Sequence, residues 1–183
     1  MDHTIYNAYV SILKEELLPA MGCTEPIAIA YAAAVARKAL GCLPEKAQVW
    51  TSGNIIKNAM AVTVPNTDGR KGIDAACAAG LVAGNPDREL QVIADVTAEQ
   101  RAELTDYLAR KCISVHLKPD ARLFDILVEV EAAGHHASAR IADRHTNVVD
   151  VIRDGQTLYH RDLEENETGK DVDEGLLSIE GIF

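Results

Sequence analysis

Residues 22–41, GCTEPIAIAYAAAVARKALG, contain the stretch that decides the fold. Thr24 followed by Glu25 and Pro26 predicts a helix start, because proline is tolerated in the first turn, where its missing N–H costs nothing. The run that follows is rich in alanine, the best helix former, and Gly41 is well placed to end the helix. Alanine side chains let neighbouring backbones approach closely, so we expect this helix to be buried.

The flanking sequence predicts helices and strands on both sides of this segment. Three-to-four spacing of apolar residues over 5–18 predicts an amphipathic helix with Thr4 as a candidate cap. Further helices are expected at 72–83 and 98–111. Strand-like segments lie at 48–51, 59–64, 90–96, 113–117, 124–131, 136–142, 147–153 and 156–160. The expected fold class is α+β, with N-terminal alanine-rich helices followed by an α/β middle that has a mixed or antiparallel sheet.

Length and charge indicate a folded protein whose C-terminal end differs from the rest. The chain has 183 residues and a formal net charge of −10, but residues 162–180 alone carry eight acids and one lysine. We therefore expect a helical unit at 1–45, an α+β domain at 46–161 and an acidic connector at 162–183. The acidic balance argues against nucleic-acid binding, which needs clustered Lys and Arg.

The four cysteines and the N-terminus bear on the cellular compartment. The cysteines are far apart and form no CxxC pair, which favours reduced thiols. No run reaches the ~18 apolar residues of a membrane span, and the first residues lack signal-peptide features. We expect a cytoplasmic protein without membrane association, in which three of the cysteines are structural: Cys42, Cys77 and Cys112.

Cys23 is the first candidate for chemistry. It directly precedes the predicted helix start, where unpaired N–H groups and the helix dipole stabilise a thiolate. Such a thiolate is a candidate base or nucleophile. Thr24 and Glu25 could cap that end or hydrogen-bond a ligand. Spacing alone favours the plainer interpretation, a buried cysteine beside a cap.

A second polar segment follows the first expected strand. Ser52 and Asn54 flank a glycine that permits a bulge or close approach of a ligand. Lys57 and Asn58 add a cation and an amide, which suit a substrate that carries a carboxylate. A surface loop with turn residues explains the same pattern equally well.

Histidines supply a third candidate. His145, with Thr146 and Asn147 beside it, is a candidate polar site at a strand entrance. His135 and His136 are neighbours on an expected strand and point to opposite faces, so they cannot easily bind one ion. No metal site is predicted from these residues, since no HExxH or Cys-His spacing occurs.

Together these motifs resemble a known family. Residues 22–28 (GCTEPIA), 52–60 (SGNIIKNAM), the loop at 65–72 and residues 145–147 are similar to the N-terminal half of the L-cysteine desulfidases, which are related to the bacterial iron–sulfur L-serine dehydratases. The resemblance implies a cytoplasmic lyase that breaks L-cysteine into hydrogen sulfide, pyruvate and ammonia, or an L-serine dehydratase-like enzyme. It also implies a four-iron–four-sulfur cluster in place of pyridoxal phosphate.

The resemblance also suggests roles for individual residues. It implies that Cys23 is the base on the substrate α-proton, and that four residues bind the substrate carboxylate or shape the site: Ser52, Asn54, Lys57 and Asn58. The cluster-binding cysteines of that family lie beyond the matched half. This implies that the ligands are not in this chain, that a C-terminal half or a partner subunit carries the cluster, and that this chain alone is inactive.

Two other classes of function fit the same sequence. One is a non-catalytic sensor module that binds an amino acid through the polar loops. The other is an assembly subunit whose alanine-rich helices pack against another chain, which a homo-oligomer would also satisfy. The choice between cysteine and serine as substrate stays open, because the two differ only by sulfur for oxygen.

Overall fold

The computed structural model describes residues 3–17 and 19–163. The chain divides into two units, and helix α1 (His3–Glu16) is the described element of the first. It begins two residues before the predicted start, so the expectation that Thr4 is its cap is wrong. The second unit comprises residues 20–162 and contains all other elements. Apart from its first two residues, the expected acidic connector at 162–183 lies outside the described residues.

Helix α2 (Thr24–Leu40) is the centre of the second unit. It begins at the predicted residue, with Cys23 as its N-cap in an extended conformation. Gly41 ends it at a φ of 92°, a left-handed conformation that favours glycine, and its N–H donates to the Arg37 carbonyl at 2.9 Å. The residues from Pro26 to Ala34 are all buried. The expectation of a buried alanine-rich helix is confirmed.

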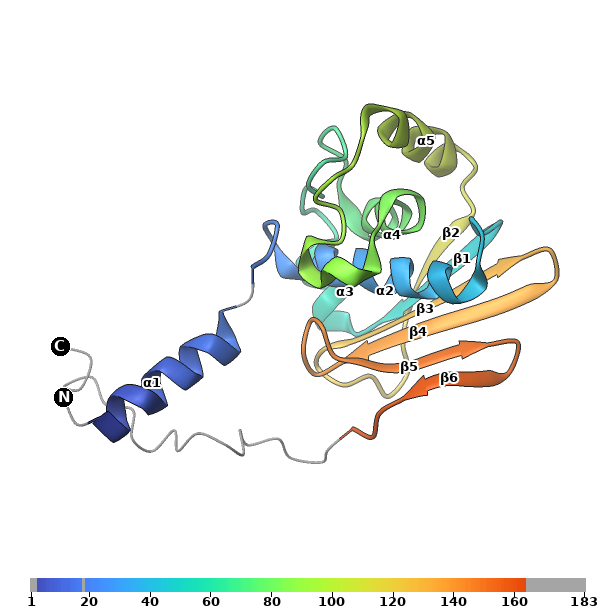
Figure 1. Ribbon diagram of the computed structural model, residues 1–183. Helices are drawn as coiled ribbons and strands as arrows, with labels where there is room; N and C mark the ends of the chain where they lie inside the picture. The colour runs from blue at the N-terminus through green and yellow to red at the C-terminus, as the bar shows by residue number, and fades with distance from the viewer. Residues whose placement is uncertain (1–2, 18, 164–183) are drawn as a thin grey trace. The chain divides into compact units, whose positions relative to one another are not determined.

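A six-stranded mixed sheet lies against α2 (Figure 1). The strand order is β2-β1-β3-β4-β5-β6, and only the β1–β2 pair is parallel. The α+β class with a mixed sheet is therefore confirmed. The strands are β1 (Lys46–Thr51), β2 (Ile113–Leu117), β3 (Asp125–Ala132), β4 (His135–Ala142), β5 (Val148–Arg153) and β6 (Gln156–His160).

Strand register puts one apolar row under α2. Val49 pairs with Val128, Val128 with Ala139, and Ala139 with Val151, and all four are buried. The β5–β6 hairpin turns at the predicted dipeptide, where Asp154 and Gly155 both have positive φ, as a type I′ turn requires. The alternation in these segments thus correctly predicts both strands and buried face.

Two more helices stack beyond α2 on the side away from the sheet (Figure 1). Helix α4 (Gly72–Ala83) packs on α2, and α5 (Ala98–Ala109) packs on α4. The α5 cap is the predicted Thr97, whose hydroxyl accepts from the Gln100 N–H while the Gln100 side chain accepts from the Thr97 N–H. These helices and the short helix α3 (Gly53–Ala59), with the turns between them, make the long crossover that a parallel β1–β2 pair requires.

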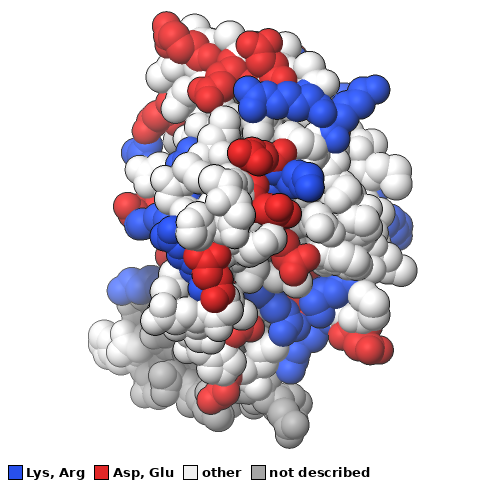
Figure 2. Space-filling model, turned by 90° about the vertical axis from the view of Figure 1, so that its right-hand side faces the viewer, with Lys and Arg blue, Asp and Glu red and all other residues white. Residues whose placement is uncertain are grey.

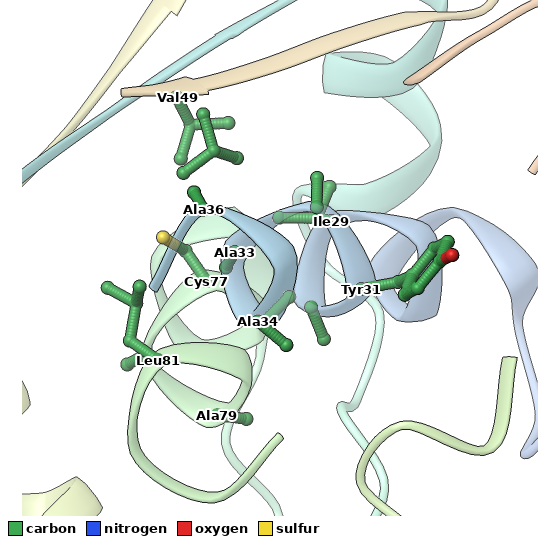
Figure 3. Close-up of a cluster of buried hydrophobic side chains, with 14 of the residues drawn as sticks. Ile29, Tyr31, Ala33, Ala34, Ala36, Val49, Cys77, Ala79 and Leu81 are labelled. Atoms are coloured by element: carbon green, nitrogen blue, oxygen red, sulfur yellow. The ribbon is translucent and has the colours of Figure 1, made fainter. Parts of the chain in front are cut away.

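Small side chains make the α2–α4 contact close. Figure 3 shows alanines of α2 between Val49 of β1 and the α4 residues Cys77, Ala79 and Leu81. A Cβ added at Gly80 would lie 2.8 Å from the carbonyl carbon of Ala30. The two helix backbones can approach this closely only because position 80 has no side chain.

Two predicted strands are absent from the described residues. The segment 59–64 follows a short helix, α3 (Gly53–Ala59), and its Thr63 forms only an isolated bridge with Lys71. The segment 90–96 continues from a 3-10 helix, η1 (Pro86–Gln91), in place of a strand. Its alternating apolar residues are buried among the helices, and Asn66 donates to the carbonyls of Ile93 and Ala94, so no partner strand is needed.

Surface charge and helix length give two further observations. Figure 2 shows acidic and basic side chains interspersed over one face of the molecule, without a basic stripe on that face. None of the helices in the described residues combines the length and the apolar character that a bilayer crossing requires.

Candidate functional site

The N-terminal end of α2 holds a thiol and a carboxylate in contact. Gly22 has a φ of 101°, and Cys23 follows it as the extended N-cap residue. The Cys23 Sγ donates to the Glu25 Oε2 at 3.0 Å, and the Thr24 hydroxyl lies 3.5 Å from the same oxygen. The carboxylate of Glu25 therefore faces back toward the two residues before it.

Helix α3 supplies the second part of this site. Its Asn58 side-chain amide donates to the Glu25 Oε1 at 3.2 Å, so each carboxylate oxygen of Glu25 has a partner. The position of α3 follows from its cap: the Ser52 hydroxyl accepts from the Ile55 N–H and donates to the Leu123 carbonyl at 2.8 Å. Ser52 is buried and acts in the local structure.

The loop between β4 and β5 brings His145 to the same carboxylate. The charge of Glu25 acts on His145, and the imidazole packs on the Phe124 ring with 4.4 Å between centroids. Burial lowers the pKa of His145, against the opposing effect of Glu25. The ring is therefore neutral near pH 7, and it can accept or donate a proton.

The charges at this site differ from the thiolate that the helix position predicts. Partial burial and the hydrogen bond to Glu25 raise the pKa of Cys23. The hydrogen bond from Cys23 lowers the pKa of Glu25, with smaller contributions from Asn58 and His145. At neutral pH the pair is thus a thiol and a carboxylate, because partial burial and the hydrogen bond to Glu25 together outweigh the helix dipole.

The other predicted site residues lie around this group or away from it. Asn54 and Lys57 are exposed on α3; Asn54 lies one turn before Asn58, whereas Lys57 is its immediate neighbour and faces another side of the helix. Thr146 lines a different hollow, beside Tyr31. Asn147 holds its own loop: its amide donates to the Ala142 carbonyl, and its oxygen accepts from Arg161.

A cluster of charged side chains around the buried Asp125 fixes the start of α3, and sequence reasoning missed it. Asp125, fully buried, receives two hydrogen bonds from Arg140, at 2.9 and 2.8 Å, and an ion pair from Lys118 at 3.2 Å. Its carbonyl accepts from the Thr51 hydroxyl and the Ser52 N–H. The start of α3 is thereby fixed to β3. Only a lone Asp at a strand start was visible in the sequence.

The described residues do not fit a four-iron–four-sulfur cluster. No group of three or more His, Cys, Asp or Glu side chains able to hold a metal occurs among them. All four cysteines lie in described segments and none forms a disulfide: Cys23 and Cys42 are exposed, Cys112 is half-buried and Cys77 is buried. Cys23 is the only cysteine that contacts the candidate site in this part of the chain.

Known proteins resemble this chain over nearly all of its length. It is 45% identical over 174 residues to a UPF0597 protein of Desulfitobacterium hafniense, which covers 95% of this chain and 39% of the relative. A UPF0597 protein of Treponema denticola is 39% identical over 100% of the chain and 43% of the relative. One from Fusobacterium nucleatum is 40% identical over 95% and 41%. No family model matches the chain.

These findings correct the resemblance drawn from the motifs. Matched over nearly the whole chain, the relatives are named UPF0597 proteins, and no cysteine desulfidase or serine dehydratase name occurs among them. Assignment to the L-cysteine desulfidase family is therefore wrong. Four short segments carried it, at 22–28, 52–60, 65–72 and 145–147, whereas the comparison extends over more than 170 residues. The chain spans about two fifths of the length of the curated relatives it matches.

Proposed function

We propose that this chain is the substrate-binding and proton-transfer part of a lyase that acts on a small amino acid, L-cysteine or L-serine, within a longer protein. The observation that supports the proposal is the 3.0 Å hydrogen bond from the Cys23 thiol to the Glu25 carboxylate. A base beside a weakly acidic nucleophile is the usual arrangement for activating it.

The pair can exchange one proton without a change in its total charge. Transfer of the thiol proton to Glu25 leaves a thiolate and a carboxylic acid, and the thiolate can then accept the substrate α-proton. The electron pair of the broken C–H bond forms the Cα–Cβ double bond. The β-substituent leaves with its bonding pair, as hydrosulfide from L-cysteine or hydroxide from L-serine. Asn58 fixes the carboxylate during this exchange.

The substrate's own charges have complementary groups nearby. The exposed Lys57 and Asn54 suit the substrate carboxylate, since they lie three residues apart on α3 and Asn54 is one turn from Asn58. The proposal extends to the rest of the protein: a C-terminal part or partner subunit would carry the four-iron–four-sulfur cluster. We further propose a cytoplasmic location, because the cysteines are unpaired.

An assay of the full-length protein tests the catalytic role. Sulfide and pyruvate release from L-cysteine, measured under anaerobic conditions, should fall by at least about a hundredfold in Cys23→Ala, in the range that a lost general base costs. Glu25→Gln should also lower kcat, and Glu45→Gln, at an exposed residue outside the candidate site, is the control. Undiminished turnover in Cys23→Ala would rule out the base role.

A second candidate is a sensor that binds an amino acid without converting it. The protonated thiol at rest favours this class, because binding needs no thiolate. Calorimetry of the chain with L-cysteine, L-serine and L-alanine compares the two. Equal affinity for the three amino acids, which differ in their β-substituent, together with no turnover by the full-length protein, would favour the sensor over the lyase.

A further inference from the structure

A second hollow lies on the other side of the loop that carries His145. It has a volume of about 360 Å³, within the ~300–1,000 Å³ range of ligand pockets. Helix α2, η1 and the β5–β6 hairpin enclose it. Its walls include Tyr31, Glu89, Thr146, Tyr159 and Arg161. The hollow does not include Cys23, Glu25 or Asn58.

Tyr31 is the most informative group in this hollow. Its side chain is 8% exposed, and Figure 3 shows its oxygen at the end of the ring directed away from the alanine cluster. Within the described part of the chain, the Tyr31 hydroxyl forms no hydrogen bond. It lies at the wall of the hollow. A hydroxyl on a buried ring that opens into a cavity can accept a hydrogen bond from a ligand.

The unpaired groups of the hollow are mostly acceptors. Among the described residues, the Glu89 carboxylate has no hydrogen bond or ion pair, whereas Lys38 is paired with Asp87 at 2.6 Å. Arg161 donates to the Asn147 side chain at 2.9 Å. The cations are thus engaged, while a carboxylate and two tyrosine hydroxyls remain available. Burial, with the nearby Glu89 and Asp87, raises the pKa of Tyr31.

The backbone at Glu89 is also unusual. Its φ of 47° and ψ of −117° lie in a region that favours glycine, inside η1. Glu89 is an exposed residue of the hollow's wall, and a glycine would adopt its backbone conformation with less strain. Glu89 thus belongs to the same wall of the hollow as Tyr31.

We propose that this hollow binds a small molecule through a primary ammonium group, at a site separate from the Cys23 pair. The Glu89 carboxylate supplies the opposite charge, and the Tyr31 and Tyr159 hydroxyls accept hydrogen bonds from the ammonium. The tyrosine rings add attraction for a cation. The ammonium can belong to an amino acid, whose carboxylate would then meet the N–H groups of Arg161 that do not bond to Asn147, or to a simple amine.

Three probes distinguish these sources. Ethylamine has only the ammonium, L-serine has both charges, and propionate has only the carboxylate. In titrations followed by two-dimensional NMR of the whole chain, ethylamine should shift the amide signals of Tyr31, Glu89 and Thr146, and propionate should not. Tighter binding of L-serine than of ethylamine would identify an amino-acid site, and the reverse order an amine site.

Variants separate this site from the proposed catalytic one. Glu89→Gln should weaken ethylamine binding by about tenfold or more, as loss of a charged partner does, and Tyr31→Phe by a few-fold. Glu25→Gln and the exposed surface change Glu45→Gln should leave these NMR shifts unchanged. If Glu25→Gln abolishes the shifts and Glu89→Gln does not, the ammonium binds only at the Cys23 pair and the second site is overturned.

The variant Glu89→Gly distinguishes loss of the carboxylate from an effect on folding. Glycine relieves the backbone conformation while it removes the carboxylate, so the variant should be at least as stable as the natural chain and should still lose ethylamine binding. Retained binding in this variant, or no shifts with any amine in the natural chain, would overturn the proposal.

Discussion

Helix α2 meets two regions of the molecule in opposite ways. Along its length it contacts α4 through alanine and glycine, with the backbones nearly touching at Gly80 and Ala30. At its N-terminal end it contacts α3 through polar groups, where Glu25 receives hydrogen bonds from Cys23 and Asn58. The first region is buried and the second is partly exposed.

The difference separates scaffold from site. Close packing makes the α2–α4 contact sensitive to a single methyl group, because neighbouring backbones cannot move aside. The polar end tolerates substitution in stability terms, since its hydrogen bonds are partly exposed and contribute little each. Changes in the first region should therefore alter folding, and changes in the second should alter chemistry.

Gly80→Ala should have the largest effect on stability. The added methyl would overlap the Ala30 carbonyl group, so we expect a loss of about 3 kcal/mol in the free energy of unfolding, or failure to fold. Urea denaturation followed by circular dichroism measures this loss. The control is Gly53→Ala, where the nearest atom to a new Cβ is Leu117 Cδ1 at 3.8 Å. Equal stability of the two variants would contradict the close contact.

Asp125→Asn should cost about 3 kcal/mol, because it leaves Arg140 and Lys118 without their buried partner. Burial alone would raise the pKa of Asp125, but Arg140 and Lys118 outweigh it and the pKa is lowered. The stabilisation is therefore present above the pKa of an unfolded aspartate, about 3.9, and is lost as pH falls through the lower folded value.

Unfolding curves at several pH values test this linkage. The stability difference between the natural chain and Asp125→Asn should be constant near neutral pH and shrink below about pH 4. Asp143→Asn, which removes only the exposed partner of Arg122, should cost less than about 1 kcal/mol. A difference that grows toward low pH would have the wrong sign.

Ser52→Ala should have an intermediate effect, since it removes both the cap of α3 and the hydrogen bond to Leu123. We expect a loss of about 1–2 kcal/mol. Asn54→Ala on the exposed side of the same helix is the control and should be close to neutral. Thermal unfolding of the two variants compares them, and an equally stable Ser52→Ala would show that α3 does not need its cap.

Glu25→Gln should change chemistry with the smallest change in stability. Removal of the carboxylate charge removes causes of the raised pKa of Cys23, so the pKa falls and alkylation by iodoacetamide at mildly alkaline pH becomes a few-fold faster. Peptide mass spectrometry resolves Cys23 from the exposed Cys42, whose rate should not change. Slower alkylation of Cys23 would mean that Glu25 acts as its activating base at rest.

Local patterns predicted most of the elements. Alanine content and the flanking Pro26 and Gly41 correctly predicted α2, and alternation predicted the strands of the sheet. The segments 59–64 and 90–96 misled because short apolar runs fit strands and buried turns equally. No local signal told that the carbonyls of Ile93 and Ala94 would be satisfied by Asn66 instead of a neighbouring strand.

The candidate site was only partly predictable. Cys23, Glu25 and Asn58 stood out as residue types, but the sequence indicated a thiolate where the structure has a thiol. The direction of the Cys23 pKa shift depends on its burial and on the position of the Glu25 side chain. Neither follows from spacing in the sequence. Phe124 and Asp125 carried no signal at all, since their roles arise from contacts with His145 and Arg140.

The sequence by itself determined most of the helices and strands and predicted that α2 is buried, because these properties depend largely on neighbours along the chain. Tertiary structure decided which distant residues meet. The residues of the site belong to three segments: Cys23, Asn58 and His145. They are brought together by the order of strands in the sheet and by the hydrogen bond that attaches the start of α3 to β3. The hollow at Tyr31 arises in the same way, where α2, η1 and the β5–β6 hairpin bring together a carboxylate and hydroxyls that have no partner among the described residues.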